Sequence, residues 1–527
     1  MKANYMHENH RLTLQSALDA VKSQQERNVL GQFATPTELA KDIVSFSQSL
    51  LSSDLPIRFF DPAIGTGSFY SALRTLLPPD KITAAEGFEI DPHYAAPAQK
   101  FWAKTPLKIH LGDFTTAIPP QDEASRFNLL VCNPPYVRHH HIINGEKTRL
   151  QNAALKASDI KITGLSGLYC YFMALSHTWM AENGIAAWLV PSEFMNVNYG
   201  MSIKRYLLTK VNLLRIHRFD PNDFQFEDAL VSSAVISFRK EQPAKNNTIE
   251  FTFGGTVANP KVRKFVSAEI LLREPKWIRF PLADIRDDKK KITLGDLFHI
   301  KRGLATGDNN FFIFTREKIE DLQLSWKFFR PLLPSPRYLA DDHIKADSHG
   351  NPLLDKQLFL LDCRISEREI KSQYANLWNY LETGKPKVSE RYLCRSRKPW
   401  YRQEDRSPTP FVCTYMGRSD KKNGRPFRFI LNESKAVAVN VYLMMYPKSS
   451  LSLALTNDPS IIEKIWACLN RIDARLLIEE GRVYGGGLHK LEPKELANVP
   501  IDNILKEINF SIDISPLQQD LFEKRIA

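Results

Sequence analysis

Short β-rich runs alternate with helical stretches over residues 57–239, and this alternation constrains the fold more than any other feature of the chain. The runs include IRFFD (57–61), LKIHLGDF (107–114), FNLLVCN (127–133) and GIAAWLVP (184–191). Such a rhythm is typical of parallel strands joined by helices on both faces of a sheet. We therefore predict an α/β fold, with a Rossmann-like domain whose mainly parallel, twisted sheet has its ligand crevice at the carboxyl ends of the strands.

The rest of the chain predicts a second domain of another kind. A chain of 527 residues exceeds what one hydrophobic core supports, since single cores stop growing near about 250–300 residues. The polar stretch EQPAKNNTIE (241–250) is the candidate linker, and the Pro-broken strands and helices after it favour an α+β domain. The predicted domains are residues 1–245 and 246–527.

A basic excess indicates an acidic partner. The formal net charge is +12, and residues 391–428 alone carry eleven Lys or Arg against three acids, a net +8. Four aromatic residues, Tyr392, Trp400, Tyr401 and Phe427, lie among these charges. Basic side chains interleaved with aromatic ones suit neutralisation of a nucleic-acid backbone.

Other features argue against several classes of protein. No window approaches about 18 consecutive apolar residues, and the N-terminal sequence lacks the apolar core of a signal peptide, so we expect a cytoplasmic protein without a membrane partner. The six cysteines form no Cys-x-x-Cys pair, which argues against disulfides and a structural zinc site. Adjacent residues such as His139–His141 cannot converge on one ion from a regular element, so we expect no metal.

Chemically suited residues follow three successive strand-like runs. Segment 61–68 (DPAIGTGS) places glycines on a turn, where the backbone can approach a ligand and amides can face an anion. Glu89 ends the next run, where a carboxylate can accept both hydroxyls of a ribose. Asp113 ends the third run and can accept from an exocyclic amine, with Phe114 beside it to flank a purine. These strand ends predict contacts to a nucleoside.

The sequence Asn133-Pro134-Pro135-Tyr136 (NPPY) ends the run FNLLVC. Two consecutive prolines cannot continue a central strand, so the chain must leave the sheet there. The Asn133 side-chain oxygen and the Pro134 carbonyl can each accept one hydrogen of an amino group, which frees the nitrogen lone pair for attack. Tyr136 offers a face on which a base can stack.

These motifs, in this order, resemble those of the gamma-class, Taq-like, S-adenosylmethionine-dependent N6-adenine DNA methyltransferases of type II restriction-modification systems. The resemblance covers about residues 25–240 and rests on GQFATP (31–36), DPAIGTGSF (61–69), GFEIDP (87–92), GDF (112–114) and NPPY. It implies methyl transfer from S-adenosylmethionine to N6 of a flipped adenine in double-stranded DNA. The first domain would then be catalytic, and the second would recognise the target sequence.

The resemblance also implies roles for individual residues. The cofactor-binding residues are Thr35, Pro36, Asp61, Pro62, Ala63, Gly65, Gly67, Glu89, Asp113 and Phe114. The catalytic residues are Asn133, Pro134, Pro135 and Tyr136. Family members pack a further aromatic residue against the flipped base, and Phe226 has the matching spacing, with Phe224 as its competitor. Independently of the family, Thr35 has the pattern of a helix N-cap, with Pro36 at N1 and Glu38 at N3.

Further residues are predicted to contact DNA. Arg138 and the histidines after it would form a loop near DNA, and Arg395 and Arg397 belong to the basic region. The segment YGGGLHKLEPKELANVPI (484–501) resembles the end of the target-recognition domain in the same class. There Gly486 and its neighbours permit close approach of the backbone to phosphate, and Lys490 adds a charge.

Three alternatives stay open at this point. Enzymes that share NPPY methylate the amide of a protein glutamine, but they resemble only the first half of the chain. An RNA adenine methyltransferase would be equally basic. A non-catalytic DNA-binding specificity subunit would keep the fold without the reaction.

A separate restriction endonuclease is the expected functional partner. The sequence shows no metal-dependent nuclease cluster and no spare domain to house one, and modification enzymes often have an endonuclease encoded alongside. DPAIGTGSFYSAL and NPPYVRHHH are similar to modification enzymes of the PstI/BsuBI kind, which implies CTGCAG as the target.

Overall fold

The computed structural model describes residues 2–220, 233–281, 292–419, 425–484 and 487–501, and the chain divides into two compact units. Unit 1 comprises Met1–Arg286 and Tyr484–Gly486, and unit 2 comprises Asp287–Val483 and Gly487–Ala527. Over the described ranges, no helix is long and apolar enough to cross a membrane. All six cysteines are buried, and none of them forms a disulfide bond.

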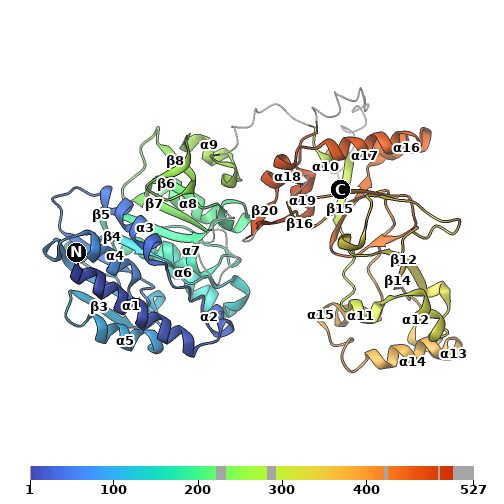
Figure 1. The fold of residues 1–527 in the computed structure, drawn as a ribbon, viewed down its shortest axis with the longest axis horizontal. Helices are drawn as coiled ribbons and strands as arrows, with labels where there is room; N and C mark the ends of the chain where they lie inside the picture. The colour runs from blue at the N-terminus through green and yellow to red at the C-terminus, as the bar shows by residue number, and fades with distance from the viewer. Residues whose placement is uncertain (1, 221–232, 282–291, 420–424, 485–486, 502–527) are drawn as a thin grey trace. The chain divides into compact units, whose positions relative to one another are not determined.

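A nine-stranded sheet forms the centre of unit 1, in the order β3-β2-β1-β4-β5-β7-β6-β8-β9 (Figure 1). The strands are β1 (Ile57–Asp61), β2 (Ile82–Glu89), β3 (Leu107–Leu111), β4 (Phe127–Cys132), β5 (Met180–Pro191), β6 (Asn212–Arg218), β7 (Ser233–Arg239), β8 (Thr248–Gly255) and β9 (Pro260–Ser267). Only β7 and β9 run antiparallel to their neighbours in the sheet. The predicted α/β fold with a mainly parallel sheet is confirmed.

The strand order reverses between β1 and β4, which are parallel neighbours. The chain adds β2 and β3 on one side of β1 and then returns to place β4 on the other side. In open α/β sheets, ligands bind outside the carboxyl ends of the strands at such a switch point. The topology alone therefore locates the place to look for a site.

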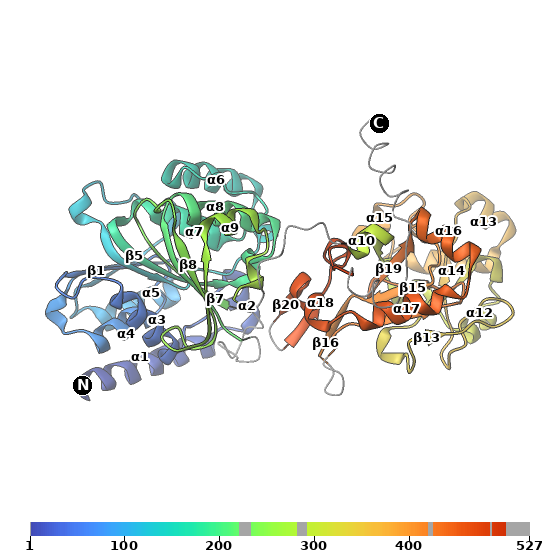
Figure 2. The same ribbon diagram turned by 90° about the horizontal axis from the view of Figure 1, so that it is seen from above.

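Helices cover both faces of this sheet, and each layer has its own hydrophobic core (Figure 2). On one face lie α3 (Thr37–Ser49), α4 (Ser68–Leu76) and α5 (Pro92–Trp102), and on the other lie α6 (Asn144–Ser158), α7 (Leu168–Leu175), α8 (Met201–Thr209) and α9 (Ala268–Arg273). Successive strand residues serve opposite cores: Phe59 packs in the first and Phe60 in the second. The helices α1 (Lys2–Val21) and α2 (Gln24–Leu30) precede this framework.

The domain boundary expected at residues 245/246 falls inside the nine-stranded sheet. Ile249 and Phe251 of β8 are fully buried in the same core as Phe238 of β7. The polar stretch 241–250 is therefore a connection within unit 1, and the unit continues to Arg286. A polar composition marks a turn, but it does not distinguish a turn between strands from a linker between domains.

Unit 2 combines three smaller sheets with short helices, as expected of an α+β domain. The sheet orders are β10-β19-β15-β17-β13, β11-β14-β12-β18 and β16-β21-β20. The strands are β10 (Phe298–Arg302), β11 (Ile313–Phe314), β12 (Phe329–Leu333), β13 (His343–Ile344), β14 (Leu358–Leu361), β15 (Phe411–Thr414), β16 (Met416–Arg418), β17 (Phe429–Asn432), β18 (Val437–Ala438), β19 (Tyr442–Pro447), β20 (Arg482–Tyr484) and β21 (Leu488–Lys490). The helices are α10 (Leu294–Leu297), α11 (Asn309–Phe312), α12 (Arg316–Asp321), α13 (Glu367–Gln373), α14 (Ala375–Gly384), α15 (Tyr392–Arg395), α16 (Ser449–Asn457), α17 (Ile461–Arg471), α18 (Ala474–Glu480) and α19 (Pro493–Ala497).

Candidate active site

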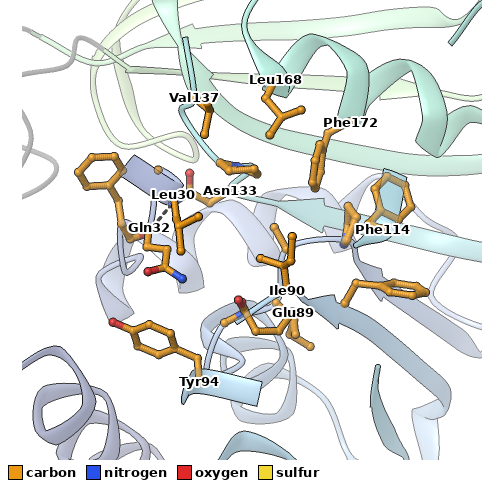
Figure 3. Close-up of a pocket in the computed structure, with 18 of the residues that line it drawn as sticks. Leu30, Gln32, Glu89, Ile90, Tyr94, Phe114, Asn133, Val137, Leu168 and Phe172 are labelled. Carbon is orange, nitrogen blue, oxygen red and sulfur yellow. Dashed lines mark hydrogen bonds between the residues drawn. The ribbon is translucent and has the colours of Figure 1, made fainter. Parts of the chain in front are cut away.

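A cavity of about 500 Å³ opens at the carboxyl ends of β1 to β4, at the switch point of the sheet (Figure 3). Asp61 is the last residue of β1 and Glu89 that of β2, while Asp113 follows β3 and Asn133 follows β4. All four line the cavity. Parallel topology thus gathers side chains that are distant in the sequence.

The structure brings most of the predicted site residues to this cavity. Among the predicted cofactor residues, those that line it are Thr35, Asp61, Pro62, Ala63, Gly65, Glu89, Asp113 and Phe114, and those that do not are Pro36 and Gly67. Within NPPY, the lining residues are Asn133 and Pro135, and the others are Pro134 and Tyr136. Phe224 and Phe226 lie outside the described residues.

The turn after β1 adopts a conformation that favours glycine. Gly65 and Gly67 have φ values of 54° and 88°, in the left-handed region. A Cβ atom on Gly67 would lie 2.7 Å from Nε1 of Trp102, which donates a hydrogen bond to the Thr66 carbonyl at 2.9 Å. A Cβ atom on Gly65 would meet nothing within 4 Å. Trp102 therefore holds the turn at Thr66 and Gly67, while the space next to the backbone of Gly65 is open.

Two carboxyl groups on the cavity wall hold their protons unusually tightly. Burial raises the pKa of Glu89 to about 7, against the opposing effect of amide hydrogen bonds from Asp91 at 2.9 Å and Gly65 at 3.1 Å. Burial likewise raises the pKa of Asp61 to about 7, although the Ala63 amide donates to it at 3.1 Å. A ligand that offers hydroxyl donors or a positive charge would favour the ionised forms. This wall therefore suits a cationic ligand that carries hydroxyl groups.

The corner beyond β3 combines an acceptor with aromatic faces. Asp113 begins the turn η2 (Phe114–Thr116), and its carboxylate accepts from the amide and the hydroxyl of Thr115, both at 2.8 Å. Phe114 is only 3% exposed, and its ring centroid lies 5.1 Å from that of Phe172 on α7. Asp113 and both rings line the cavity. Such a corner suits a purine with an exocyclic amine.

The Asn133 amide is held in one orientation. Its Nδ2 atom donates to the Phe33 carbonyl at 3.0 Å and to Thr35 Oγ1 at 3.1 Å. Because a carbonyl only accepts, the nitrogen must face segment 33–35 and the oxygen must point away from it. Within the described part of the chain, the buried Oδ1 atom has no hydrogen-bond partner. An unsatisfied buried acceptor costs about 1–3 kcal/mol, so a ligand that donates to Oδ1 is favoured.

The prediction that Thr35 caps a helix is wrong. Helix α3 begins at Thr37, Pro36 stands at the capping position, and Thr35 Oγ1 accepts from Asn133 instead. Close packing explains the difference: a Cβ atom on Gly31 would lie 2.4 Å from the backbone nitrogen of Tyr136. The segment that contains Thr35 is therefore pressed against NPPY rather than shaped by the helix that follows.

Tyr136 does not line the cavity, although its neighbours Pro135 and Val137 do. The Tyr136 hydroxyl donates to the Leu189 carbonyl at 3.1 Å, its ring centroid lies 5.7 Å from that of Phe33, and burial raises the Tyr136 pKa well above its usual range. Arg138 is exposed and precedes the turn η4 (His139–His141), in which His141 lines the cavity. No group of three or more potential metal ligands occurs among the described residues.

Sequence analysis missed the contribution of α1. Gln15 and Asp19 line the cavity. Arg11 is only 1% exposed, pairs with Glu8 at 2.7 Å and donates to Thr66 Oγ1, in the glycine turn, at 2.9 Å. The spacings of three and four residues place all these side chains on one helix face. That spacing was the available signal, but a polar helix face is ordinarily solvent-exposed.

The wall formed by α6 and α7 was also missed. Glu146 and Leu150 of α6 and Leu168 and Phe172 of α7 line the cavity, and Figure 3 shows Leu168 and Phe172 on one side of it. Tyr94 of α5 lines it as well, and its hydroxyl donates to Asp19 at 2.7 Å. These residues belong to no recognisable motif, since only the fold brings their helices to the strand ends.

The DNA-contact residues predicted beyond residue 390 have different surroundings. Arg395 is exposed at the end of α15. Arg397 donates to the carbonyls of Ala305 and Thr306 at 2.5 and 2.9 Å, so its guanidinium serves the fold of a loop. Lys490 pairs with Glu492 at 2.9 Å. Gly486 lies outside the described residues.

The aromatic residues of the basic region 391–428 also differ from one another. Tyr401 and Phe427 are 0% and 3% exposed and belong to hydrophobic cores, whereas Tyr392 is 76% exposed. Trp400 is half-buried and packs against Tyr401. Sequence alone did not separate the core aromatic residues from the surface one.

Two family models match the chain. The model of the Eco57I restriction-modification methylase matches residues 77–225, and the model of the C-terminal domain of the type II methyltransferase M.Eco57I matches residues 271–527. The first match spans most of the strand ends around the cavity, and the second covers all of unit 2 and the last residues of unit 1. The chain is thus similar to type II restriction-modification methyltransferases in both units.

Curated type II methyltransferases are similar to this chain over most of its length. M.AccI of Acinetobacter calcoaceticus is 25% identical over 497 residues, which cover 90% of this chain and 85% of M.AccI. M.XamI of Xanthomonas campestris pv. amaranthicola is 26% identical over 487 residues, with the same shares of the two chains. M.BsuBI of Bacillus subtilis is 27% identical, but over only 40% of this chain. The likeness that implied CTGCAG is therefore confined to part of the molecule.

A solved structure shares the fold of this chain. It is the type IIL restriction-modification enzyme MmeI, determined in complex with DNA, with a TM-score of 0.50 and 17% identity. The match covers 85% of this chain and 63% of the MmeI chain, so the present chain spans less than two thirds of that protein.

Proposed function

We propose that this chain transfers a methyl group from S-adenosylmethionine to N6 of an adenine in duplex DNA. The observation that carries the proposal is the Asn133 Oδ1 atom, a buried acceptor without a partner among the described residues, in a residue at the edge of a cavity suited to a nucleoside. Relationship to the type II methyltransferases supports the reaction class and duplex DNA as the substrate.

The cavity wall fits S-adenosylmethionine by its chemistry. Glu89 would accept the ribose hydroxyls, and the Asp113–Phe114 corner would hold the adenine. The glycine turn around Gly65, together with Thr35, would hold the methionine part. Carboxylates at Asp61 and Glu89 complement the positive charge of this molecule, which supplies an electrophilic methyl group on sulfur when bound.

The target amine would be activated by NPPY. Asn133 Oδ1, which has no hydrogen-bond partner among the described residues, and the Pro134 carbonyl would each accept one hydrogen of the amino group. Acceptance of both hydrogens draws the nitrogen from planar toward tetrahedral and exposes its lone pair. Fixed acceptors of this kind act through positioning and electrostatics, without a protein nucleophile.

The target adenine must leave the base stack to reach these acceptors, at a cost of a few kcal/mol. An aromatic platform offsets about 1–3 kcal/mol of that cost by stacking. We assign this role to Tyr136, two residues after Pro134, with Phe226 as a second face outside the described residues. Unit 2 would recognise the target sequence, and modification would protect it from a paired restriction endonuclease.

Transfer of labelled methyl from S-adenosylmethionine tests the proposal. The full chain is incubated separately with DNA that lacks modification, with RNA and with protein extract, and the labelled DNA is digested to nucleosides and its modified sites are sequenced. The proposal predicts label in N6-methyladenine of DNA at one short motif. Label in RNA adenine or in protein glutamine would overturn the substrate, and duplex binding without any transfer would favour a non-catalytic specificity subunit.

A further inference from the structure

Arg149 of α6 ties two elements of the cavity wall together. Its Nη1 atom donates to the Thr115 carbonyl at 2.9 Å and its Nη2 atom to Thr115 Oγ1 at 2.7 Å. Its Nε atom donates to Glu146 Oε1, one helical turn earlier, at 2.8 Å. The guanidinium therefore joins α6 to the turn η2, which begins at Asp113.

These contacts determine which atom donates in each hydrogen bond of a short chain that runs from Arg149 through Thr115 to Asp113. A guanidinium only donates, so Thr115 Oγ1 must accept from Arg149 and is left with its own proton to give. That proton goes to the Asp113 carboxylate, whose two oxygens each lie 2.8 Å from Thr115 Oγ1. Arg149 Nη2 itself lies 3.7 Å from Asp113 Oδ2, and Glu146 neutralises the arginine. The rotamer of Asp113 is thus set by a residue 36 positions later in the chain.

We propose that Arg149, supported by Glu146 and acting through Thr115, is a positioning residue that presents the Asp113 carboxylate to the 6-amino group of the cofactor adenine. This inference rests on the proposed function, because it takes the ligand of the Asp113 corner to be S-adenosylmethionine. Glu146 and Asp113 both line the cavity, whereas Arg149 does not line it and acts on Asp113 through Thr115. The hydrogen bond accepted by Asp113 is charge-assisted and therefore sensitive to its geometry.

A comparison of two ligands and two proteins tests this role. The dissociation constants of S-adenosylmethionine and of its analogue with purine in place of adenine are measured by calorimetry on the full-length wild type and on Arg149→Ala. In the wild type the analogue, which lacks the 6-amino group, binds about tenfold more weakly, as expected for a hydrogen bond to a charged group. In Arg149→Ala, the dissociation constant of S-adenosylmethionine should rise about tenfold, while that of the analogue should change by less than about twofold.

Two further variants keep the test decisive. Arg126→Ala is the matched control, because Arg126 also pairs with a glutamate three residues earlier, at 2.9 Å, but neither residue of that pair lines the cavity. This variant should keep the wild-type preference for S-adenosylmethionine over the analogue. Thr115→Val removes the hydroxyl that joins Arg149 to Asp113 and keeps a β-branched side chain. It should lose the preference for S-adenosylmethionine over the analogue even if Arg149→Ala fails to fold. Thermal unfolding of every variant identifies losses that come from misfolding.

The outcomes separate this inference from the proposed function. If Arg149→Ala and Thr115→Val weaken both ligands equally and keep the tenfold preference, the arginine serves only the fold and the inference is wrong. A wild type that binds S-adenosylmethionine without preference for the 6-amino group also overturns the inference, but it leaves methyl transfer intact. A wild type that binds neither ligand and transfers no methyl group overturns the proposed function itself.

Discussion

The strand ends of unit 1 and the basic segment 391–428 of unit 2 are both prominent in the sequence, but the structure uses them differently. Asp61, Glu89, Asp113 and Asn133 come from four separate strands and line one cavity. In the basic segment, Arg397 donates to backbone carbonyls and Arg428 pairs with Asp342 at 2.7 Å, while Arg395 is exposed.

The difference shows what each kind of pattern constrains. The carboxyl ends of parallel strands lie at the same edge of a sheet, so motifs that follow successive strands place their side chains close together. A count of charges determines only the net electrostatic field of a segment, because an arginine in it can be engaged in hydrogen bonds or ion pairs within the protein. Predictions about the first region can be tested by chemistry, whereas those about the second must first separate folding from binding.

The largest expected effect is on the stability of unit 1. Arg11→Ala leaves Glu8 buried without its partner, so we expect a loss of about 3–5 kcal/mol in the free energy of unfolding. Arg273→Ala removes an exposed pair with Glu269 and should change the same quantity by less than about 1 kcal/mol. Denaturant unfolding of the full chain measures both. Equal effects of the two substitutions would show that the contacts of Arg11 with Glu8 and Thr66 do not stabilise the packing of α1 on the glycine turn.

The basic segment should divide into folding and binding residues. Arg397→Ala leaves the carbonyls of Ala305 and Thr306 without their donor, which should cost about 1–3 kcal/mol of stability. Arg395→Ala should leave stability unchanged within about 0.5 kcal/mol. It should instead lower the salt dependence of duplex binding by about one phosphate contact. A salt slope unchanged in Arg395→Ala would remove this residue from the DNA contacts.

The buried carboxyl on β2 should make cofactor affinity depend on pH. Hydroxyl donors favour the ionised form of Glu89, whose pKa burial raises to about 7, so affinity for S-adenosylmethionine should rise about tenfold between about pH 6 and pH 8. The folding stability of the unliganded protein should depend on pH in the opposite direction. Because the pKa of the buried carboxyl is raised, it stabilises the fold at low pH, and this contribution is lost as pH rises through about 7. Calorimetry on wild type and Glu89→Gln tests this, because the variant should lose the part of the pH dependence that comes from Glu89 and keep only the part that comes from Asp61, whose pKa burial also raises to about 7.

A smaller effect is expected where the segment at Thr35 meets NPPY. Thr35→Val removes one of the two acceptors that orient the Asn133 amide, so kcat should fall by about fivefold, equivalent to one hydrogen bond of about 1 kcal/mol. Thr35→Ser keeps the hydroxyl and should retain most of kcat. Steady-state methylation assays with both variants measure the difference. An unaffected Thr35→Val enzyme would mean that the Phe33 carbonyl alone holds the amide.

Motif order accounts for the part of the site that sequence predicted. The mainly parallel sheet and the positions of Glu89, Asp113 and Asn133 follow from strand rhythm and strand-end chemistry. The contributions of Asp19, Glu146 and Phe172 could not be predicted, because they come from helices whose placement depends on tertiary packing. The domain boundary was misplaced for a related reason, since burial of Ile249 and Phe251 extends the sheet beyond a polar turn.

The most direct test of the account measures methyl transfer and cofactor binding on Asn133→Ala in the same preparation. Asn152→Ala, an exposed asparagine on α6, is the matched control. The account predicts that Asn133→Ala binds S-adenosylmethionine with nearly the wild-type dissociation constant and loses at least about 100-fold in the single-turnover rate of DNA methylation. An Asn133→Ala protein that methylates DNA at the wild-type rate, or that loses cofactor binding instead, would contradict it.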